Sequence, residues 1–279
     1  MPVADVHATA IVDPRAELDT GVQVGPYTVI GAGARIGRDT EIGVHVVLEG
    51  RVTVGARCRI GHGAIIGGAP QDLKFRDGLP VGVAIGDDTA IREYVTVHRA
   101  THEDHDTTIG RRCLVMASSH VAHDCLIGDE VIIINYAGLT GHVIVEDRAT
   151  VGGHTGIHPF TRIGTYAYVG GCSKITQDVP PFVMADGVPA AALAVNVIGM
   201  RRGGIDGEGR RRVRSAFGIL YRSGLSPAAA IARIKTELGA DPLVARLVEF
   251  VETSKRGIIP GRREQESTRE ETESEERVW

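Results

Sequence analysis

Two histidines stand three positions apart, beside an aspartate, in the stretch SSHVAHDCLIG at residues 118–128. Imidazole and carboxylate groups at this spacing could hold a metal ion, could act as a general base with a helper, or could be polar corners of a scaffold. His120, His123 and Asp124 are therefore the first candidates for chemistry. The choice depends on the elements that position them, because the surrounding sequence consists largely of Val, Ile and Gly.

An aliphatic residue recurs every six positions along most of the chain. The series runs from Val24 to Ile66 and again from Ile85 to Ile175, and within the second run only Glu103 interrupts it. Six-residue repeats of this kind are typical of a parallel β-helix, in which each unit is one short strand and a corner, and three units make one turn. We therefore predict a β-solenoid whose aliphatic side chains stack in its core.

Two segments disturb the repeat, and the pattern changes near the end of the chain. About 13 residues must leave the coil between Ile66 and Ile85, whereas the stretch around Glu103 is expected to stay in register. From about residue 207 the period is helical, which predicts three helices. We therefore expect a β-helix domain over 1–190, a helical domain over 191–260, and a charged, disordered tail over 261–279.

Residues 18 apart lie on the same edge of such a coil. This register places positions 85, 103, 121, 139, 157 and 175 in one column, and beside it His120, His123, His142 and His158. The long loop, with Asp72 and Lys74 in its QDLK sequence, leaves the coil at the same edge. This convergence favours a site over scattered polar residues. His154 falls in the next column and is expected to be an ordinary surface residue, and solvated loop positions are expected for His98, His102 and His105.

Composition narrows the class of protein. A formal charge of −4 gives no reason to expect nucleic-acid binding. The four cysteines are far apart without a CxxC pair, which indicates small core residues in a reducing compartment. The N-terminal sequence does not resemble a signal peptide, and no apolar run approaches the roughly 18 residues of a membrane span. We expect a cytoplasmic protein without integral membrane association.

Three functions remain open on the residues alone. The first is acyl transfer with a histidine as general base. The second is a zinc enzyme of the γ-carbonic-anhydrase type, which uses this fold and three histidines. The third is a non-catalytic solenoid scaffold. A set of zinc ligands explains neither the long loop nor the C-terminal helices, and a scaffold explains neither the loop nor the clustered histidines.

Several motifs together carry a family resemblance that covers nearly the whole chain. They are QDLK at 71–74, HVAHDC at 120–125, GLTGHV at 138–143, DVPPFV at 178–183 and YRSG at 221–224. With these motifs the chain resembles the bacterial UDP-N-acetylglucosamine acyltransferases that begin lipid A synthesis. The resemblance implies a left-handed β-helix, a cytoplasmic homotrimer with active sites between subunits, and transfer of a 3-hydroxyacyl group from acyl carrier protein to the sugar 3-position. It implies no metal and no cofactor beyond the carrier's own phosphopantetheine.

The resemblance also implies roles for individual residues. His123 is expected to be the general base, Asp124 to orient it, and the Gly141 N–H to receive the oxyanion. The expected substrate-binding residues are Asp72, Lys74, His120, His142, His158, Gly171, Asn196 and Arg202, of which Gly171 limits acyl length and Asn196 and Arg202 reach the nucleotide from a neighbouring subunit. Pro159, Ile198 and Tyr136 depart from the family's pattern. The 3-amino analogue of the sugar, or another surface-glycan sugar, therefore stays open as the acceptor.

Overall fold

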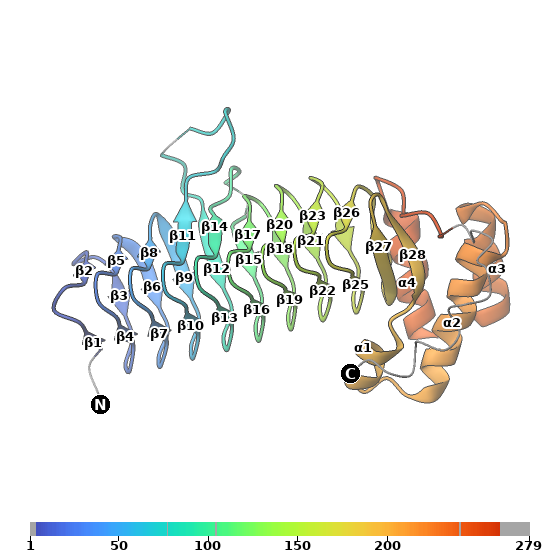
Figure 1. The fold of residues 1–279 in the computed structure, drawn as a ribbon, viewed down its shortest axis with the longest axis horizontal. Coiled ribbons are helices and arrows are strands. Elements are labelled where there is room, and N and C mark those ends of the chain that lie inside the picture. Colours follow the sequence, from blue (N-terminus) through green and yellow to red (C-terminus); the bar gives the residue numbers. More distant parts are fainter. Residues whose placement is uncertain (1–3, 77, 104, 240, 263–279) are drawn as a thin grey trace.

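The computed structural model describes residues 4–262 except 77, 104 and 240. It shows a long prism of stacked coils with helices at its C-terminal end (Figure 1). In the described part of the chain, three sheets form the faces of the prism, with 11, 9 and 8 strands. Apart from the last two strands of the 11-stranded sheet, neighbours within a sheet come from consecutive coils. The predicted β-solenoid with C-terminal helices is therefore confirmed.

We call the three faces sheets A, B and C. Sheet A contains β1 (Asp5–Val6), β4 (Gln23–Val24), β7 (Glu41–Ile42), β10 (Arg59–Ile60), β13 (Ala90–Ile91), β16 (Leu114–Val115), β19 (Ile132–Ile133), β22 (Thr150–Val151), β25 (Tyr168–Val169), β27 (Val183–Gly187) and β28 (Ala190–Val195). Sheet B contains β2 (Ile11–Val12), β5 (Val29–Ile30), β8 (Val47–Leu48), β11 (Ile65–Gly68), β14 (Thr96–His98), β17 (His120–Val121), β20 (Gly138–Leu139), β23 (Gly156–Ile157) and β26 (Lys174–Ile175). Sheet C contains β3 (Glu17–Leu18), β6 (Gly33–Ile36), β9 (Arg51–Val54), β12 (Gly82–Ile85), β15 (Thr107–Ile109), β18 (Leu126–Ile127), β21 (Ile144–Val145) and β24 (Arg162–Ile163).

The six-residue period follows from how each strand uses its two faces. In β17 the side chain of His120 points outward and is half-buried, whereas Val121 points inward and is completely buried. The next coils place Leu139 and Ile157 in the same inward register, so that their branched side chains stack along the prism. Burial of this continuous aliphatic column is the main force that holds the coils together.

The predicted register is wrong at Glu103. Val97 pairs with Val121 across sheet B, and Ile85 pairs with Ile109 across sheet C, so positions 85 and 103 do not belong to the column of Val121. The segment between β14 and β15 leaves the prism as a second loop, because an acidic side chain cannot be buried unpaired in an aliphatic core. The corrected column on sheet B is Val12, Ile30, Leu48, Ile66, Val97, Val121, Leu139, Ile157 and Ile175.

The C-terminal end contains strands and helices that the six-residue repeat does not predict. Strands β27 and β28 form an antiparallel hairpin at the edge of sheet A, and the predicted domain boundary at residue 190 is the first residue of β28. The helices are α1 (Val197–Arg202), α2 (Gly207–Arg222), α3 (Pro227–Leu238) and α4 (Pro242–Thr253), with Ser226 and Asp241 as side-chain N-caps of the last two. None of the described helices is long and apolar enough to cross a membrane.

Two smaller predictions also meet the structure here. Cys58, Cys113 and Cys125 are buried in the core as expected, but Cys172 is exposed at a corner with φ of 57°. Gly261, at the start of the predicted disordered tail, forms a parallel bridge with Ala192, so the ordered chain continues at least this far. Residues 263–279 of that tail lie outside the described part of the chain.

Candidate active site

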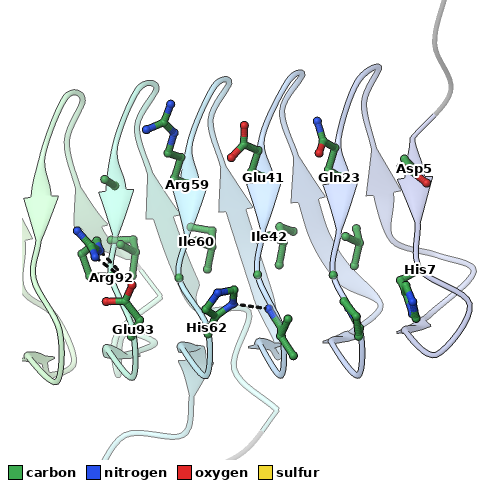
Figure 2. A pocket seen from close by; sticks show the side chains of 18 of the residues that line it. Asp5, His7, Gln23, Glu41, Ile42, Arg59, Ile60, His62, Arg92 and Glu93 are labelled. Atoms are coloured by element: carbon green, nitrogen blue, oxygen red, sulfur yellow. Dashed lines mark hydrogen bonds and ion pairs between the residues drawn. The ribbon is translucent and has the colours of Figure 1, made fainter.

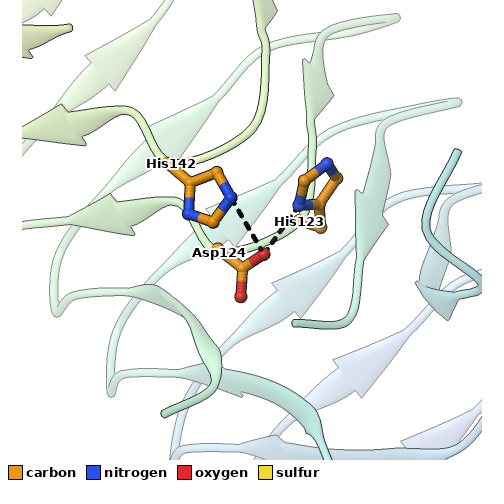
Figure 3. A group of neighbouring side chains, drawn as sticks. All are labelled: His123, Asp124 and His142. Atoms are coloured by element: carbon orange, nitrogen blue, oxygen red, sulfur yellow. Dashed lines mark hydrogen bonds and ion pairs between the residues drawn. The ribbon is translucent and has the colours of Figure 1, made fainter. Parts of the chain in front are cut away.

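The corner that joins sheet B to sheet C gathers the candidate side chains. Both loops leave the prism at this corner, one between β11 and β12 and the other between β14 and β15. Asp124, His142 and Phe160 occupy the same corner position in three successive coils, with φ of 59°, 61° and 62°. Residues other than glycine seldom adopt positive φ. Here the tight corner turns their side chains outward in register, and Figure 3 shows Asp124 between His123 and His142.

Asp124 is the hub of this cluster. Its side chain is fully buried, and its Oδ2 accepts hydrogen bonds from Nδ1 of His123 at 2.6 Å and from the Thr101 hydroxyl at 2.6 Å. Its Oδ1 accepts the Thr101 backbone N–H at 2.9 Å and lies 3.3 Å from Nε2 of His105. Burial tends to raise the pKa of Asp124, but the hydrogen bonds from Thr101 and His123 outweigh burial and hold that pKa below its ordinary value.

The anionic carboxylate determines the tautomer of His123. A carboxylate can only accept hydrogen bonds, so Nδ1 of His123 carries the proton that it donates to Asp124. The lone pair is then on Nε2, at the far side of the ring from Asp124. His123 is thus oriented as a base whose reactive nitrogen points away from its buried partner, which is the arrangement a general base requires.

Gly141 lies directly beside the His123 ring. A Cβ atom on residue 141 would be 2.5 Å from Cε1 of His123, so any larger residue would displace the ring. The Gly141 carbonyl accepts a hydrogen bond from Phe160, but among the described residues no protein acceptor lies within reach of the Gly141 N–H. The N–H is therefore a donor available to a ligand beside the His123 ring.

His120 and His98 form a second layer on sheet B. Nδ1 of His120 forms a hydrogen bond with the Thr96 hydroxyl at 2.7 Å. The rings of His98 and His120 meet edge to face, with their centroids 4.7 Å apart. The expectation that His98 is solvated is wrong, because only 9% of it is exposed and its Nδ1 is buried without a partner among the described residues. Burial, with a smaller contribution from His120, lowers the pKa of His98 to about 4.

Because His98 is buried in its neutral form, we predict that the free energy of unfolding decreases in acid. The unfolded chain protonates His98 near its ordinary pKa of 6.5, whereas the folded chain resists protonation down to about pH 4. Between these values the unfolded state binds more protons, so the free energy of unfolding falls as the pH falls, by about 3 kcal/mol from this residue. Denaturant unfolding of wild type and His98→Leu at pH 7, 5.5 and 4.5 tests this. A variant with the same pH slope as wild type would contradict the expectation.

His142, His105 and Phe160 close the cluster around Asp124. Nε2 of His142 lies 3.6 Å from Oδ2 of Asp124, and the His142 ring stacks on Phe160 with centroids 4.5 Å apart. Burial lowers the pKa of His142 more strongly than the charge of Asp124 raises it. Phe160 was not among the residues predicted from the sequence, although it follows His142 by 18 residues. Thr101 was not predicted either, and His105 was expected to be solvated, because the second loop has no periodic pattern.

The loop residues expected to bind substrate lie outside this cluster. In the long loop the Lys74 backbone N–H donates to Oδ1 of Asp72 at 2.9 Å, and the Lys74 side chain is exposed. The Phe75 ring packs under the guanidinium of Arg99 at 5.2 Å, which ties the long loop to the base of the second one. His158 is not a loop residue but lies at the corner between sheets B and C, which we call the histidine corner. Its Nδ1 donates to the Pro159 carbonyl at 3.1 Å and its ring is exposed.

Three further predicted residues lie elsewhere in the chain. Gly171 is at the corner between sheets A and B, on the other side of sheet B from the histidines. Asn196 caps α1 through Oδ1 and donates from Nδ2 to the Tyr166 carbonyl, which leaves one lone pair and one N–H for a ligand. Arg202 is exposed at the end of α1. A single chain therefore does not join these three residues to the histidine cluster.

A hollow of about 730 Å³ lies over sheet A in the first coils and contains none of the predicted site residues. Figure 2 shows Asp5, Gln23, Glu41 and Arg59 in a row along its wall. Nδ1 of His62 accepts the Val44 backbone N–H at 2.9 Å there, so this histidine has a structural role. The hollow is lined by side chains of both charges, and its location does not connect it to the cluster around Asp124.

Comparisons with known proteins place these features among acyltransferases. A family model described as UDP N-acetylglucosamine O-acyltransferase, domain 2, matches residues 178–259, and the bacterial transferase hexapeptide model matches residues 33–68 and 106–141. Two similar curated proteins are named acyl-[acyl-carrier-protein]–UDP-N-acetylglucosamine O-acyltransferase. The one from Thermodesulfovibrio yellowstonii is 47% identical and the one from Paraburkholderia phymatum is 46% identical, each over 91% of this chain and 98% of its own.

Solved structures agree with this likeness over the same extent. LpxA from Acinetobacter baumannii is 40% identical with a TM-score of 0.87, over 91% of this chain and 99% of its own. LpxA from Bacteroides fragilis, described as a UDP-N-acetylglucosamine acyltransferase, is 34% identical with a TM-score of 0.87 over the same shares.

Proposed function

The chain belongs to the UDP-N-acetylglucosamine O-acyltransferase family, and we propose that His123 is its general base. In the reaction an acyl group moves from acyl carrier protein to the sugar of UDP-N-acetylglucosamine. The protein is an acyltransferase. The acyl group is a 3-hydroxyacyl group, the acceptor atom is the sugar 3-hydroxyl, and the product enters lipid A synthesis.

The reaction follows from the arrangement at the corner. Nε2 of His123 takes the proton of the sugar hydroxyl as its oxygen attacks the thioester carbonyl carbon. The carbonyl oxygen becomes an oxyanion, which the Gly141 N–H stabilises. When the C–S bond breaks, the carrier's phosphopantetheine sulfur leaves with the proton that His123 holds. Asp124 stabilises the imidazolium between these two steps.

One observation carries this proposal above the others. The buried Asp124 fixes His123 in the tautomer with a free Nε2 lone pair, and Gly141 leaves space for the His123 ring beside an N–H that has no described protein acceptor. A base and an oxyanion donor are therefore adjacent, which is the pairing that acyl transfer needs. A non-catalytic scaffold would not require a base beside an oxyanion donor.

Substrate binding extends from the histidine corner and needs a neighbouring subunit. We propose that Asp72, Lys74, His120, His142 and His158 bind the sugar and the acyl chain's β-hydroxyl. Asn196 and Arg202 bind the nucleotide, and Gly171 bounds the acyl groove. A homotrimer in the cytoplasm brings these two sets together, which is consistent with their separation within one chain.

The identity of the acceptor decides between two activities of the same class. Neither Tyr136 nor Pro159 has a side-chain amide that could hydrogen-bond to the nucleotide. Tyr136 is 58% exposed and stacks on His154, and the Pro159 carbonyl accepts a hydrogen bond from His158. The test is an assay of purified protein with a series of acyl carrier thioesters against UDP-N-acetylglucosamine and its 3-amino analogue. We expect O-acylation of UDP-N-acetylglucosamine with the higher kcat/KM. Transfer to neither sugar would refute the proposal, and preference for the amine would make the protein an N-acyltransferase.

Catalysis needs no metal and no cofactor in this proposal, because His123 and the Gly141 N–H supply the base and the oxyanion donor. We expect full acyl transfer after exhaustive treatment with a chelator. The measurement is the initial rate of the treated protein, with its zinc content determined by elemental analysis. Loss of activity that stoichiometric zinc restores would instead support the γ-carbonic-anhydrase type of mechanism.

Gly171 is expected to limit the length of the acyl chain. A Cβ on residue 171 would lie 3.3 Å from the Gly153 carbonyl oxygen and 3.9 Å from the Gly153 nitrogen, so we expect a side chain to fit with a small adjustment and to project into the proposed groove. Gly171→Met should lower kcat/KM for long donors by about fourfold for each excluded methylene, since each contributes roughly 0.8 kcal/mol when buried. A donor-length series on both proteins measures this, and an equal loss at every length would place the groove elsewhere.

A further inference from the structure

We propose that Nδ1 of His123, Oδ2 of Asp124 and Nε2 of His142 form a reversible binding site for a zinc-class ion, which switches the active site off. The three ligand atoms lie within 4.8 Å of one another. Two of them belong to the corner position of successive coils, and the third belongs to the adjacent His123 (Figure 3). Binding is a property of the cluster itself, and only the switching effect rests on the proposed function.

The spacing of the donor atoms suits a tetrahedral ion. Nδ1 of His123 and Nε2 of His142 lie 2.6 Å and 3.6 Å from Oδ2 of Asp124. Ligands at about 2.0–2.1 Å around tetrahedral zinc are about 3.3 Å from one another. The ligand atoms of the cluster all lie within 4.8 Å of one another, so the site is completed when the 2.6 Å pair separates and the wider pairs close to this spacing. The fourth position is left for water, as in zinc sites with three protein ligands.

The residues of the second loop hold the Asp124 carboxylate in the orientation that an ion would need. The Thr101 hydroxyl and backbone N–H hold the carboxylate of Asp124 in place, and His105 lies at the opposite oxygen, so Oδ2 is preoriented toward the two histidines. Both ligand histidines are partly exposed, at 16% and 25% of their side chains, which gives an ion access from solvent.

Binding at Nδ1 would remove the base. In the active form Nδ1 of His123 carries the proton and Nε2 carries the lone pair. An ion on Nδ1 needs the lone pair of that nitrogen, so it binds the other neutral tautomer of His123, in which the single ring proton has moved through solvent from Nδ1 to Nε2. No lone pair is then left on Nε2 to accept the substrate's proton. We expect saturating zinc to inhibit acyl transfer completely and a chelator to restore the activity.

The test separates binding from activity. Chelator-treated full-length protein is titrated with Co²⁺, whose visible absorption reports tetrahedral coordination, and with Zn²⁺ by calorimetry. We expect one ion per chain. His123→Ala and His142→Ala should each weaken binding more than about a hundredfold, because losing an outer-shell partner alone typically costs 10–100-fold. His154→Ala is the matched control, since His154 occupies a corner position with φ of 56° but stacks on Tyr136, and it should bind as wild type does.

Several results would overturn the inference. They are the absence of stoichiometric binding, equal binding by wild type and both ligand variants, and an octahedral Co²⁺ spectrum. Zinc that binds at this site without reducing acyl transfer would overturn the switching effect. A wild-type protein without acyl transfer would refute the proposed function, but its metal isotherm would still decide the binding site. Circular dichroism of each variant confirms that loss of binding does not come from unfolding.

Discussion

Replacing His123 by alanine is expected to reduce acyl transfer by about 100- to 10,000-fold, the usual contribution of a general base. The side chain is on the outside of the prism, beside Gly141 and hydrogen-bonded to Asp124, so its loss leaves the aliphatic column of sheet B intact. The measurement is the single-turnover rate with saturating acyl carrier thioester, because chemistry must limit the rate for the base to be visible.

The control for His123→Ala is a histidine at an equivalent corner without the chemistry. His154→Ala removes a ring that stacks on Tyr136 at 4.8 Å, away from Asp124, and it should keep the wild-type rate. Both variants should retain the wild-type subunit assembly and thermal stability within a few degrees. A His123→Ala protein that keeps more than about a tenth of the wild-type rate would remove His123 from the role of general base.

Replacing Asp124 by asparagine is expected to have an effect of similar size, about 100- to 10,000-fold in kcat. The asparagine amide can donate to Nδ1 of His123, which favours the tautomer with the proton on Nε2 and leaves no base for the sugar hydroxyl. In a buried Asp–His pair of a serine protease, the same change lowers kcat about 10⁴-fold for this reason.

Asp124 acts through His123, so its test must exclude a purely structural effect. The Asp124 side chain is fully buried, so we expect it not to touch the substrate, and the KM for the sugar nucleotide should change little while kcat falls. Steady-state kinetics of Asp124→Asn, together with its thermal melting, provide both quantities. A rise in KM with an unchanged kcat would mean that Asp124 supports binding instead of the tautomer of His123.

Much of the fold is predictable because its core repeats with a fixed period. The aliphatic series determines the three sheets, and helix caps such as Asp241 define the last helices. The register failed at Glu103 because an excursion of six residues keeps the phase of a six-residue repeat, so the same spacing is compatible with a coil and with a loop. The β27–β28 hairpin and the six-residue α1 were missed because neither is long enough to show a period.

The active-site cluster was partly predictable for the same reason. His123 and Asp124 are adjacent in sequence, and His142 follows Asp124 by 18 residues, so the repeat alone brings them to one corner. Thr101 and His105 reach Asp124 from the irregular second loop, whose path depends on tertiary contacts and not on period. The burial of His98 was missed for a related reason, since the residue ends β14 at the base of that loop.

Asp124 and His123 are proposed to act as one unit in catalysis, and a double-mutant cycle measures this coupling. Single-turnover rates are measured for wild type, His123→Ala, Asp124→Asn and the double variant. If Asp124 works only through the His123 imidazole, we expect the double variant to be no slower than His123→Ala alone. Losses that multiply, so that the double variant is slower by the product of the two single effects, would show independent roles and would contradict the proposed mechanism.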